Sequence, residues 1–142
     1  MSTPRRPRTA EELQAVATAA CEELPSAEMS HPFGPEWDVW KVRGRVFMLQ
    51  GEREGVGHVT VKAHPDDVRA LSEGVDGITR GYHMSKKHWI TLEPSKELDA
   101  ELVQDLVAES YCLVVEKLPK RERPVDPEAF GRRRREARER PS

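Results

Sequence analysis

The chain has 142 residues, of which 37% are hydrophobic and 34% are charged. This length suits one domain rather than two. No run of about 18 apolar residues is present and no apolar segment follows the N-terminal arginines, which argues against a membrane span and a signal peptide. The two cysteines stand far apart, which argues against a disulfide scaffold, so we expect a cytoplasmic protein with reduced thiols.

The net charge of −2 conceals an uneven distribution along the chain. Residues 1–8 hold three arginines and no acid, and residues 119–142 hold nine basic and five acidic residues. Residues 9–118 therefore carry 11 basic and 20 acidic side chains. Because an acidic body repels a polyanion at long range, binding of nucleic acid requires a local basic patch or the basic ends.

Hydrophobic periodicity predicts seven elements in the order α-β-β-β-α-β-α. They are a helix at 10–24, strands at 37–42, 45–50 and 58–62, a short helix that begins at 65, a strand at 88–92 and a long helix at 99–117. The segments 25–36, 51–57 and 75–81 are predicted to be loops and turns, because proline or glycine interrupts each of them. Helices on one face of an antiparallel sheet of about four or more strands make an α+β fold.

The composition divides the chain into three parts. Residues 1–8 are expected to be a disordered basic arm, and residues 9–118 a single α+β domain. Residues 119–142 are expected to be an Arg-rich flexible tail, either disordered or a lone fluctuating helix, because they contain few apolar side chains. This tail is predicted either to bind a polyanion or to fold back on the acidic body.

The stretch Gly-Tyr-His-Met-Ser-Lys-Lys-His-Trp-Ile at 81–90 resembles a signature of the MmcQ/YjbR family of small bacterial proteins. Segments 40–47, 61–65 and 110–119 are similar to further parts of the family pattern, and the resemblance covers about 9–120. The chain departs from the pattern at Thr79-Arg80, where the family usually has a proline. The resemblance implies a fold like that of bacterial frataxin (CyaY) and a DNA-binding role in which two wing-like elements touch the duplex.

Cations and aromatic groups gather in the predicted hairpin turn, in segment 80–89 and in the tail. Such groups bind phosphates and stack on bases, although charges in turns are also simply solvated or protect a sheet edge. The residues that we predict to contact nucleic acid are Lys41, Arg43, Arg45, Arg80, Tyr82, His83, Lys86, Lys87, His88, Arg132, Arg133, Arg134 and Arg135.

A small-molecule binding or resistance protein is the alternative, since some relatives of the resembled family lie beside antibiotic biosynthesis genes. Its ligand, a small aromatic molecule, would lie in a pocket lined by Trp37, Trp40, Tyr82 and Trp89. The competing interpretation of Trp89 is that a tryptophan in a strand belongs to the core. Response to salt separates the two functions, because only binding to DNA weakens steeply as salt rises.

We find no catalytic motif and no spacing of histidines and cysteines that predicts a metal site, and we expect neither an enzyme nor a cofactor. Cys21 and Cys112 are interpreted as inert residues on helices. Ser110 lies on the apolar stripe of the last helix, where its hydroxyl is expected to bond back to the carbonyl of Leu106. A monomer without membrane contacts is expected.

Overall fold

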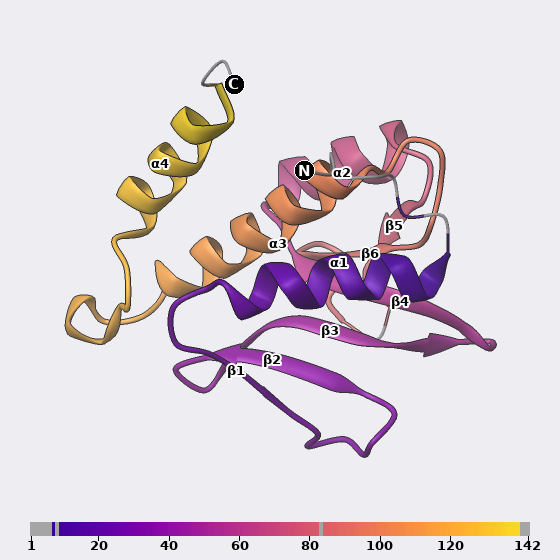
Figure 1. Cartoon of the computed structure of the whole chain (residues 1–142), viewed down its shortest axis with the longest axis horizontal. Coiled ribbons are helices and arrows are strands. Elements are labelled where there is room, and N and C mark those ends of the chain that lie inside the picture. The colour runs from indigo at the N-terminus through magenta and orange to yellow at the C-terminus, as the bar shows by residue number, and fades with distance from the viewer. Residues whose placement is uncertain (1–6, 8, 83, 140–142) are drawn as a thin grey trace.

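A six-stranded antiparallel sheet, ordered β1-β2-β3-β4-β6-β5, forms the framework of the protein (Figure 1). The computed structural model describes residue 7 and residues 9–82 and 84–139, without the side chains of 135 and 137–139, so most of the basic arm expected at 1–8 lies outside the described residues. The strands are β1 (Ala27–Ser30), β2 (Asp38–Val42), β3 (Arg45–Arg53), β4 (Val56–Lys62), β5 (Ile78–Arg80) and β6 (Trp89–Leu92). The helices are α1 (Ala10–Glu22), α2 (Pro65–Gly74), α3 (Ala100–Val115) and α4 (Pro127–Glu139), with a 3-10 turn η1 (Lys120–Glu122). The predicted α+β class is confirmed.

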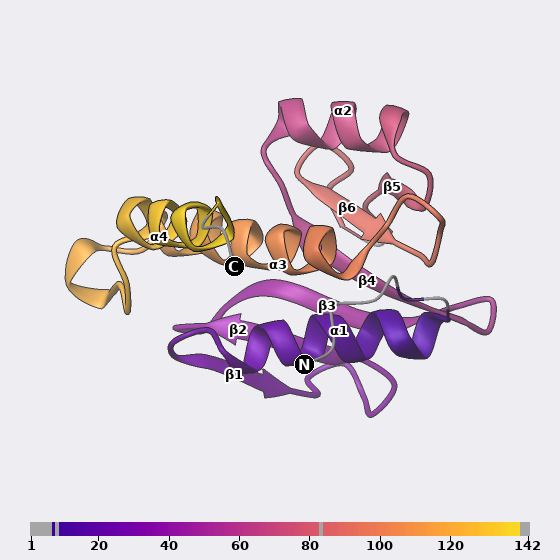
Figure 2. The ribbon, with the colours of Figure 1, turned by 45° about the horizontal axis from the view of Figure 1, so that its top comes forward.

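The helices α1, α2 and α3 share one apolar core with a single face of the sheet. Leu13, Val68 and Val103, one from each helix, belong to the same buried cluster as Val59, Val61 and Ile90 of the sheet. Figure 2 shows α1 and α3 side by side and α2 over the β5–β6 end. The alternation predicted for β4 is thereby confirmed, because Val59 and Val61 both face this core.

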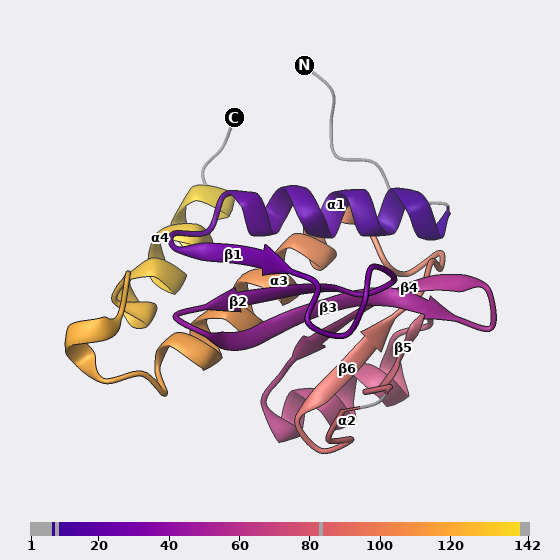
Figure 3. The ribbon, with the colours of Figure 1, turned by 90° about the horizontal axis from the view of Figure 1, so that it is seen from below.

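The opposite face of the sheet is covered by loops. Val39, Leu49 and Trp89 form a small buried cluster there, against which Trp37, Val46 and Met84 pack. Figure 3 views the molecule from this side, with the β1–β2 loop crossing in front of the strands. We call this surface the loop-covered face.

Local sequence explains where the first helix begins and where the first hairpin turns. Thr9 caps α1, since its hydroxyl accepts a hydrogen bond of 3.1 Å from the amide of Glu12. Arg43 and Gly44 connect β2 and β3 with φ angles of 50° and 81°, the left-handed pair that a two-residue hairpin needs. The hairpin that the Arg-Gly pair predicts is therefore confirmed.

Three segments predicted as loops contain strand residues. β1 lies within 25–36, β5 lies within 75–81, and β3 and β4 extend through most of 51–57. In the last case the turn is only Glu54-Gly55, with φ angles of 53° and 81°, so the interpretation of 51–57 as a loose turn is wrong. β1 and β5 are short edge strands whose pairing is set by their neighbours rather than by apolar alternation.

The C-terminal segment folds back on α3 through α4. The ring of Phe130 lies 5.8 Å from that of Tyr111, and the guanidinium of Arg134 lies 3.7 Å from the carboxylate of Asp105. Arg43 at the hairpin tip donates a hydrogen bond to the carbonyl of Glu122 in η1. An aromatic contact and an ion pair thus hold α4 against α3 in the segment that the sequence predicts to be a flexible tail or a lone helix. None of the helices in the described ranges is long and apolar enough to cross a bilayer.

Candidate anion-binding site

The sheet opens between β3 and β4. Their pairing ends at Met48 and Val61, beyond which β3 continues beside β2 while β4 turns toward α2 (Figure 3). A β-bulge at Phe47 marks the same place, because Lys41 pairs with Val46 while Trp40 pairs with Met48. A bulge increases the local twist of a strand, and this one lies next to the point where the pairing of β3 with β4 ends.

Ser110 of α3 fills this opening. Its hydroxyl accepts a hydrogen bond of 2.9 Å from the amide of Lys62 and donates one of 2.5 Å to the carbonyl of Phe47. The serine thus satisfies the two backbone groups that the separated strands leave unpaired. The expectation that Ser110 bonds to its own helix at Leu106 is wrong, because the Phe47 carbonyl is buried and the Lys62 amide part-buried, whereas a helical carbonyl already has its ladder partner.

A cleft of about 290 Å³ lies where the strands separate. Its walls come from the start of β3, the end of β4, the start of β6 and the end of α3. Three of its six lining residues are cations and the other three are apolar. They are Arg45, Lys62 and Lys117, and Val46, Trp89 and Val114. We call this hollow the basic cleft.

Trp89 holds one of these cations in position. The Lys62 ammonium lies 5.6 Å from the centroid of the Trp89 ring, within the range of a cation–π contact. Trp89 itself is only 7% exposed, so it supports the cleft from beneath and is a core residue. Gly81 permits this arrangement, because a Cβ there would lie 2.6 Å from the Cβ of Trp89.

Several predicted contact residues are engaged in local structure. A guanidinium nitrogen of Arg80 donates to the carbonyl of Lys86, and the Lys86 ammonium donates to the carbonyl of Gly81. These two cations therefore hold the turn that follows β5. Arg43 is likewise tied to η1, so of the hairpin tip only Arg45 lines the basic cleft.

The other predicted cations are dispersed. Lys41 lies opposite Val46 on β3 and opposite Glu28 on β1, so its charge faces a carboxylate-bearing neighbour. Lys87 is exposed and His88 half-buried. On α4, Arg132 and Arg133 are exposed and Arg134 pairs with Asp105, while the side chain of Arg135 and all of His83 lie outside the described residues.

The four aromatic residues predicted to line a pocket lie on different faces. Trp40 belongs to the helix-side core, and Trp89 supports the basic cleft. Trp37 and Tyr82 lie on the loop-covered face, where their rings are 5.5 Å and 5.3 Å from that of buried His58. The guanidinium of Arg53 lies 4.8 Å above the Tyr82 ring. Trp37 and Tyr82 thus come together on His58, and Trp37 also packs against the buried cluster that contains Trp89, whereas Trp40 lies on the helix side of the sheet.

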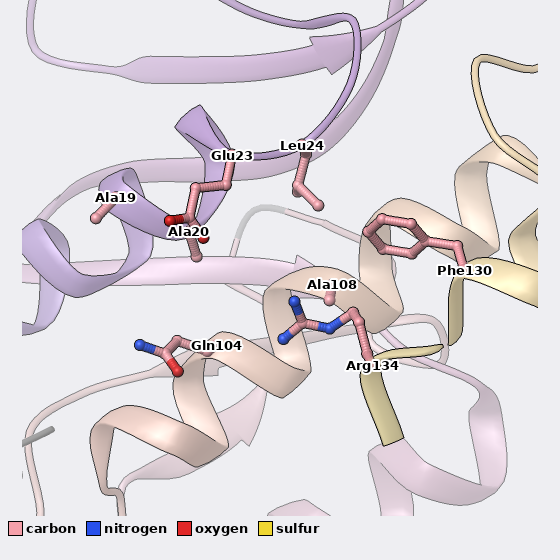
Figure 4. A pocket seen from close by; sticks show the side chains of 8 residues that line it. All are labelled: Ala19, Ala20, Glu23, Leu24, Gln104, Ala108, Phe130 and Arg134. Atoms are coloured by element: carbon pink, nitrogen blue, oxygen red, sulfur yellow. The ribbon is translucent and has the colours of Figure 1, made fainter. Parts of the chain in front are cut away.

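Two further hollows contain acidic side chains. A groove of about 290 Å³ between α1 and α3 is lined by Glu23 and by Phe130 and Arg134, which reach into it from α4 (Figure 4). A third hollow, beside α4, includes Glu109, Glu116, Asp126 and Glu128 with a single arginine. Among these three hollows, only the basic cleft has cations without a carboxylate in its lining.

Groups suited to nucleophilic or metal chemistry do not gather in the described ranges. Burial raises the pKa of the Cys21 thiol, which disfavours the reactive thiolate. The thiol packs 3.4 Å from the sulfur of Met48, as expected for a small core residue. In the part of the chain that the structure describes, no three His, Cys, Asp or Glu residues group closely enough to hold a metal ion.

Lys62 and Lys117 are the cleft residues that the sequence interpretation did not select. Both follow apolar patterns, Lys62 at the end of a strand and Lys117 after the last turn of α3. A cation that continues the inner apolar stripe of a helix indicates a binding residue, because a side chain at such a position normally faces the core.

Comparisons with known proteins agree with this architecture. The family model YjbR matches residues 22–113. The uncharacterised protein YbdF of Escherichia coli O157:H7 is 43% identical over 100 residues, which cover 70% of this chain and 82% of that protein. The crystal structure of Deinococcus radiodurans protein DR2400, assigned to domain DUF419, superposes with a TM-score of 0.70 at 32% identity and covers 87% of this chain and 89% of its own. A protein from Pseudomonas syringae, with a TM-score of 0.57 at 24% identity over 70% of this chain and 95% of its own, shares the fold.

Proposed function

This chain belongs to the YjbR family, and we propose on that premise that it binds DNA without catalysing a reaction. A phosphate group of the DNA is held in the basic cleft by Arg45, Lys62 and Lys117. The exposed arginines of α4 add contacts that do not depend on base sequence.

The observation that carries the proposal is the convergence of three cations, from β3, from β4 and from the end of α3, on one cleft. Residues 9–118 have nearly twice as many acids as bases, so random placement would surround each cation with carboxylates. The basic cleft instead has no carboxylate in its lining. A phosphate there meets attraction at short range, where screening by salt is weakest.

The geometry also favours a preformed site over an adaptable one. Ser110 fixes the separation of β3 and β4, and Trp89 orients the ammonium of Lys62. A site whose groups are already held in place loses little conformational freedom on binding. The lining combines cations with apolar side chains, and this chemistry suits the binding of an anion.

Fluorescence anisotropy with a labelled duplex over a range of salt concentrations tests the proposal. The affinity is expected to fall steeply as salt rises. The variant Arg45→Ala/Lys62→Ala/Lys117→Ala is expected to reduce the salt slope by about 0.9 for each phosphate that it no longer neutralises. A neutral ligand would show almost no dependence on salt.

The matched control removes three exposed cations that do not line the cleft. Arg69→Ala/Lys96→Ala/Arg121→Ala changes the net charge by the same amount. If both variants lose affinity equally, the cleft has no special role and only overall charge matters. If the unaltered protein binds no duplex even at low salt, the proposal is wrong.

A further inference from the structure

We infer that the basic cleft binds a terminal phosphate monoester rather than the diester backbone of nucleic acid. Such a terminal phosphate has two sources. For the first, a phosphorylated DNA end, the inference rests on the proposed function. The other source is a small free phosphate ester, and the chemistry that the cleft recognises is the same for both.

Charge is the first argument. A backbone diester carries one negative charge, whereas a phosphate monoester carries about −1.5 to −2 at neutral pH and has three free oxygens. The cleft offers three separate cationic side chains with no carboxylate among its lining residues. Three donors that surround one hollow match three terminal oxygens, and only a phosphate with a single ester bond presents all three.

Size is the second argument. The volume of about 290 Å³ is close to the lower limit of small-molecule pockets, which begin at about 300 Å³. A duplex lies across such a hollow but does not enter it. A terminal phosphate with the sugar that carries it projects from its polymer and fits inside.

The floor and walls of the cleft supply the third argument. The hydroxyl of Ser110 already bonds both strand edges, so β3 and β4 cannot close over the opening without losing two hydrogen bonds. Val46 and Val114 line the cleft beside the cations and give an apolar surface for the carbon atoms attached to the phosphate. The ammonium of Lys62 lies over the Trp89 ring, where a stacked base would have to lie. The cleft therefore does not recognise a base by stacking on Trp89.

The test compares two labelled duplexes that differ only in a 5′-phosphate or a 5′-hydroxyl. The phosphorylated duplex is expected to bind about tenfold more tightly, as for added charge-assisted hydrogen bonds. Arg45→Ala/Lys62→Ala/Lys117→Ala is expected to abolish this difference, while the Arg69→Ala/Lys96→Ala/Arg121→Ala control retains it. Lys117→Ala alone, a change at an exposed position, provides a second variant that leaves the core intact.

Competition by adenosine 5′-monophosphate, with adenosine as its control, separates the two sources. If both duplexes bind equally and the cleft variant binds neither, the monoester inference is wrong, but the proposal of DNA binding stands. Binding of the monophosphate that depends on the cleft, without binding of either duplex, supports the inference and overturns DNA as the partner. No binding of the monophosphate and no preference for the phosphorylated end overturns the inference.

Discussion

The hydroxyl of Ser110 on α3 donates a hydrogen bond of 2.5 Å to the backbone carbonyl of Phe47 on β3, across a separation of 63 residues. The same hydroxyl accepts from the amide of Lys62, so one side chain joins two strands and a helix. Because Ser110 is completely buried, water does not replace it. The basic cleft opens above this serine, and its geometry therefore depends on a residue that no ligand touches.

Ser110→Ala is expected to lower the free energy of unfolding by about 1–3 kcal/mol, because it leaves the part-buried amide of Lys62 and the buried carbonyl of Phe47 without their partner. Urea denaturation measures the change. Ser72→Ala is the control, since that hydroxyl bonds only to Arg69 of its own helix and its removal is expected to cost less than about 0.5 kcal/mol. Equal effects of the two substitutions would contradict the structural role of Ser110.

Gly81→Ala is expected to destabilise the protein by about 1–3 kcal/mol, because the added methyl overlaps with Trp89 and the strand must shift. The shift also moves Trp89 away from the ammonium of Lys62. Thermal unfolding gives the stability, and anisotropy with the labelled duplex gives the accompanying decrease in affinity.

Gly74→Ala is the matched control for Gly81. Nothing lies within 4 Å of a Cβ at this glycine, which ends α2. Its replacement is expected to be neutral or to stabilise the protein by up to about 1 kcal/mol, since alanine restricts the unfolded chain. Similar destabilisation at both glycines would show that Trp89 does not constrain position 81.

The elements that sequence predicts correctly are those with strong local signals. Thr9 caps α1, the left-handed Arg43-Gly44 turn defines the first hairpin, and the apolar stripe of α3 is continuous. β1 has no such signal, because its four residues are mostly exposed and it is recruited by pairing with β2. Pattern reasoning detects burial, and an exposed edge strand has little of it.

Local sequence predicts only part of the candidate site. Arg45 belongs to a hairpin whose turn is predictable, so its exposure is predictable too. Lys62 and Lys117 reach the same cleft only because β4 leaves β3 at the bulge and α3 passes over the gap. This convergence is a property of tertiary packing, which residue spacing along the chain does not encode.

Tyr111→Phe is expected to flatten the decrease of stability at alkaline pH. Burial raises the pKa of Tyr111 from 10.0 to about 12, so the unfolded chain ionises this phenol first. Stability from the neutral phenol is present below pH 10 and is lost as pH rises toward 12. Denaturation at a series of pH values, compared between the two proteins, measures the difference in slope. Parallel curves through this range would contradict the assignment.

At neutral pH the same substitution removes the hydrogen bond of 2.6 Å from the Tyr111 hydroxyl to the carbonyl of Pro25. The expected cost is about 0.5–1.5 kcal/mol. The ring itself remains and still packs against Phe47 and Phe130. A cost well above this range would mean that α4 has also separated from α3.

Arg132→Ala/Arg133→Ala is expected to weaken binding to DNA more than Lys86→Ala/Lys87→Ala does. Both arginines are exposed on α4, whereas the ammonium of Lys86 already donates to Gly81. Each phosphate that is no longer neutralised lowers the salt slope by about 0.9, so the arginine variant shows the shallower dependence.

The arginine pair is a sharper probe of the C-terminal segment than its deletion. Removal of residues 120–142 also breaks the bond of Arg43 to Glu122 and exposes Tyr111 where Phe130 packs, so that stability and charge change together. The double substitutions alter charge alone, and anisotropy on the same duplex compares them directly. If the two variants lose affinity equally, the arginines of α4 have no advantage over Lys86 and Lys87 and the prediction is wrong. If both variants keep the affinity and salt slope of the unaltered protein, the basic cleft carries the interaction without either pair.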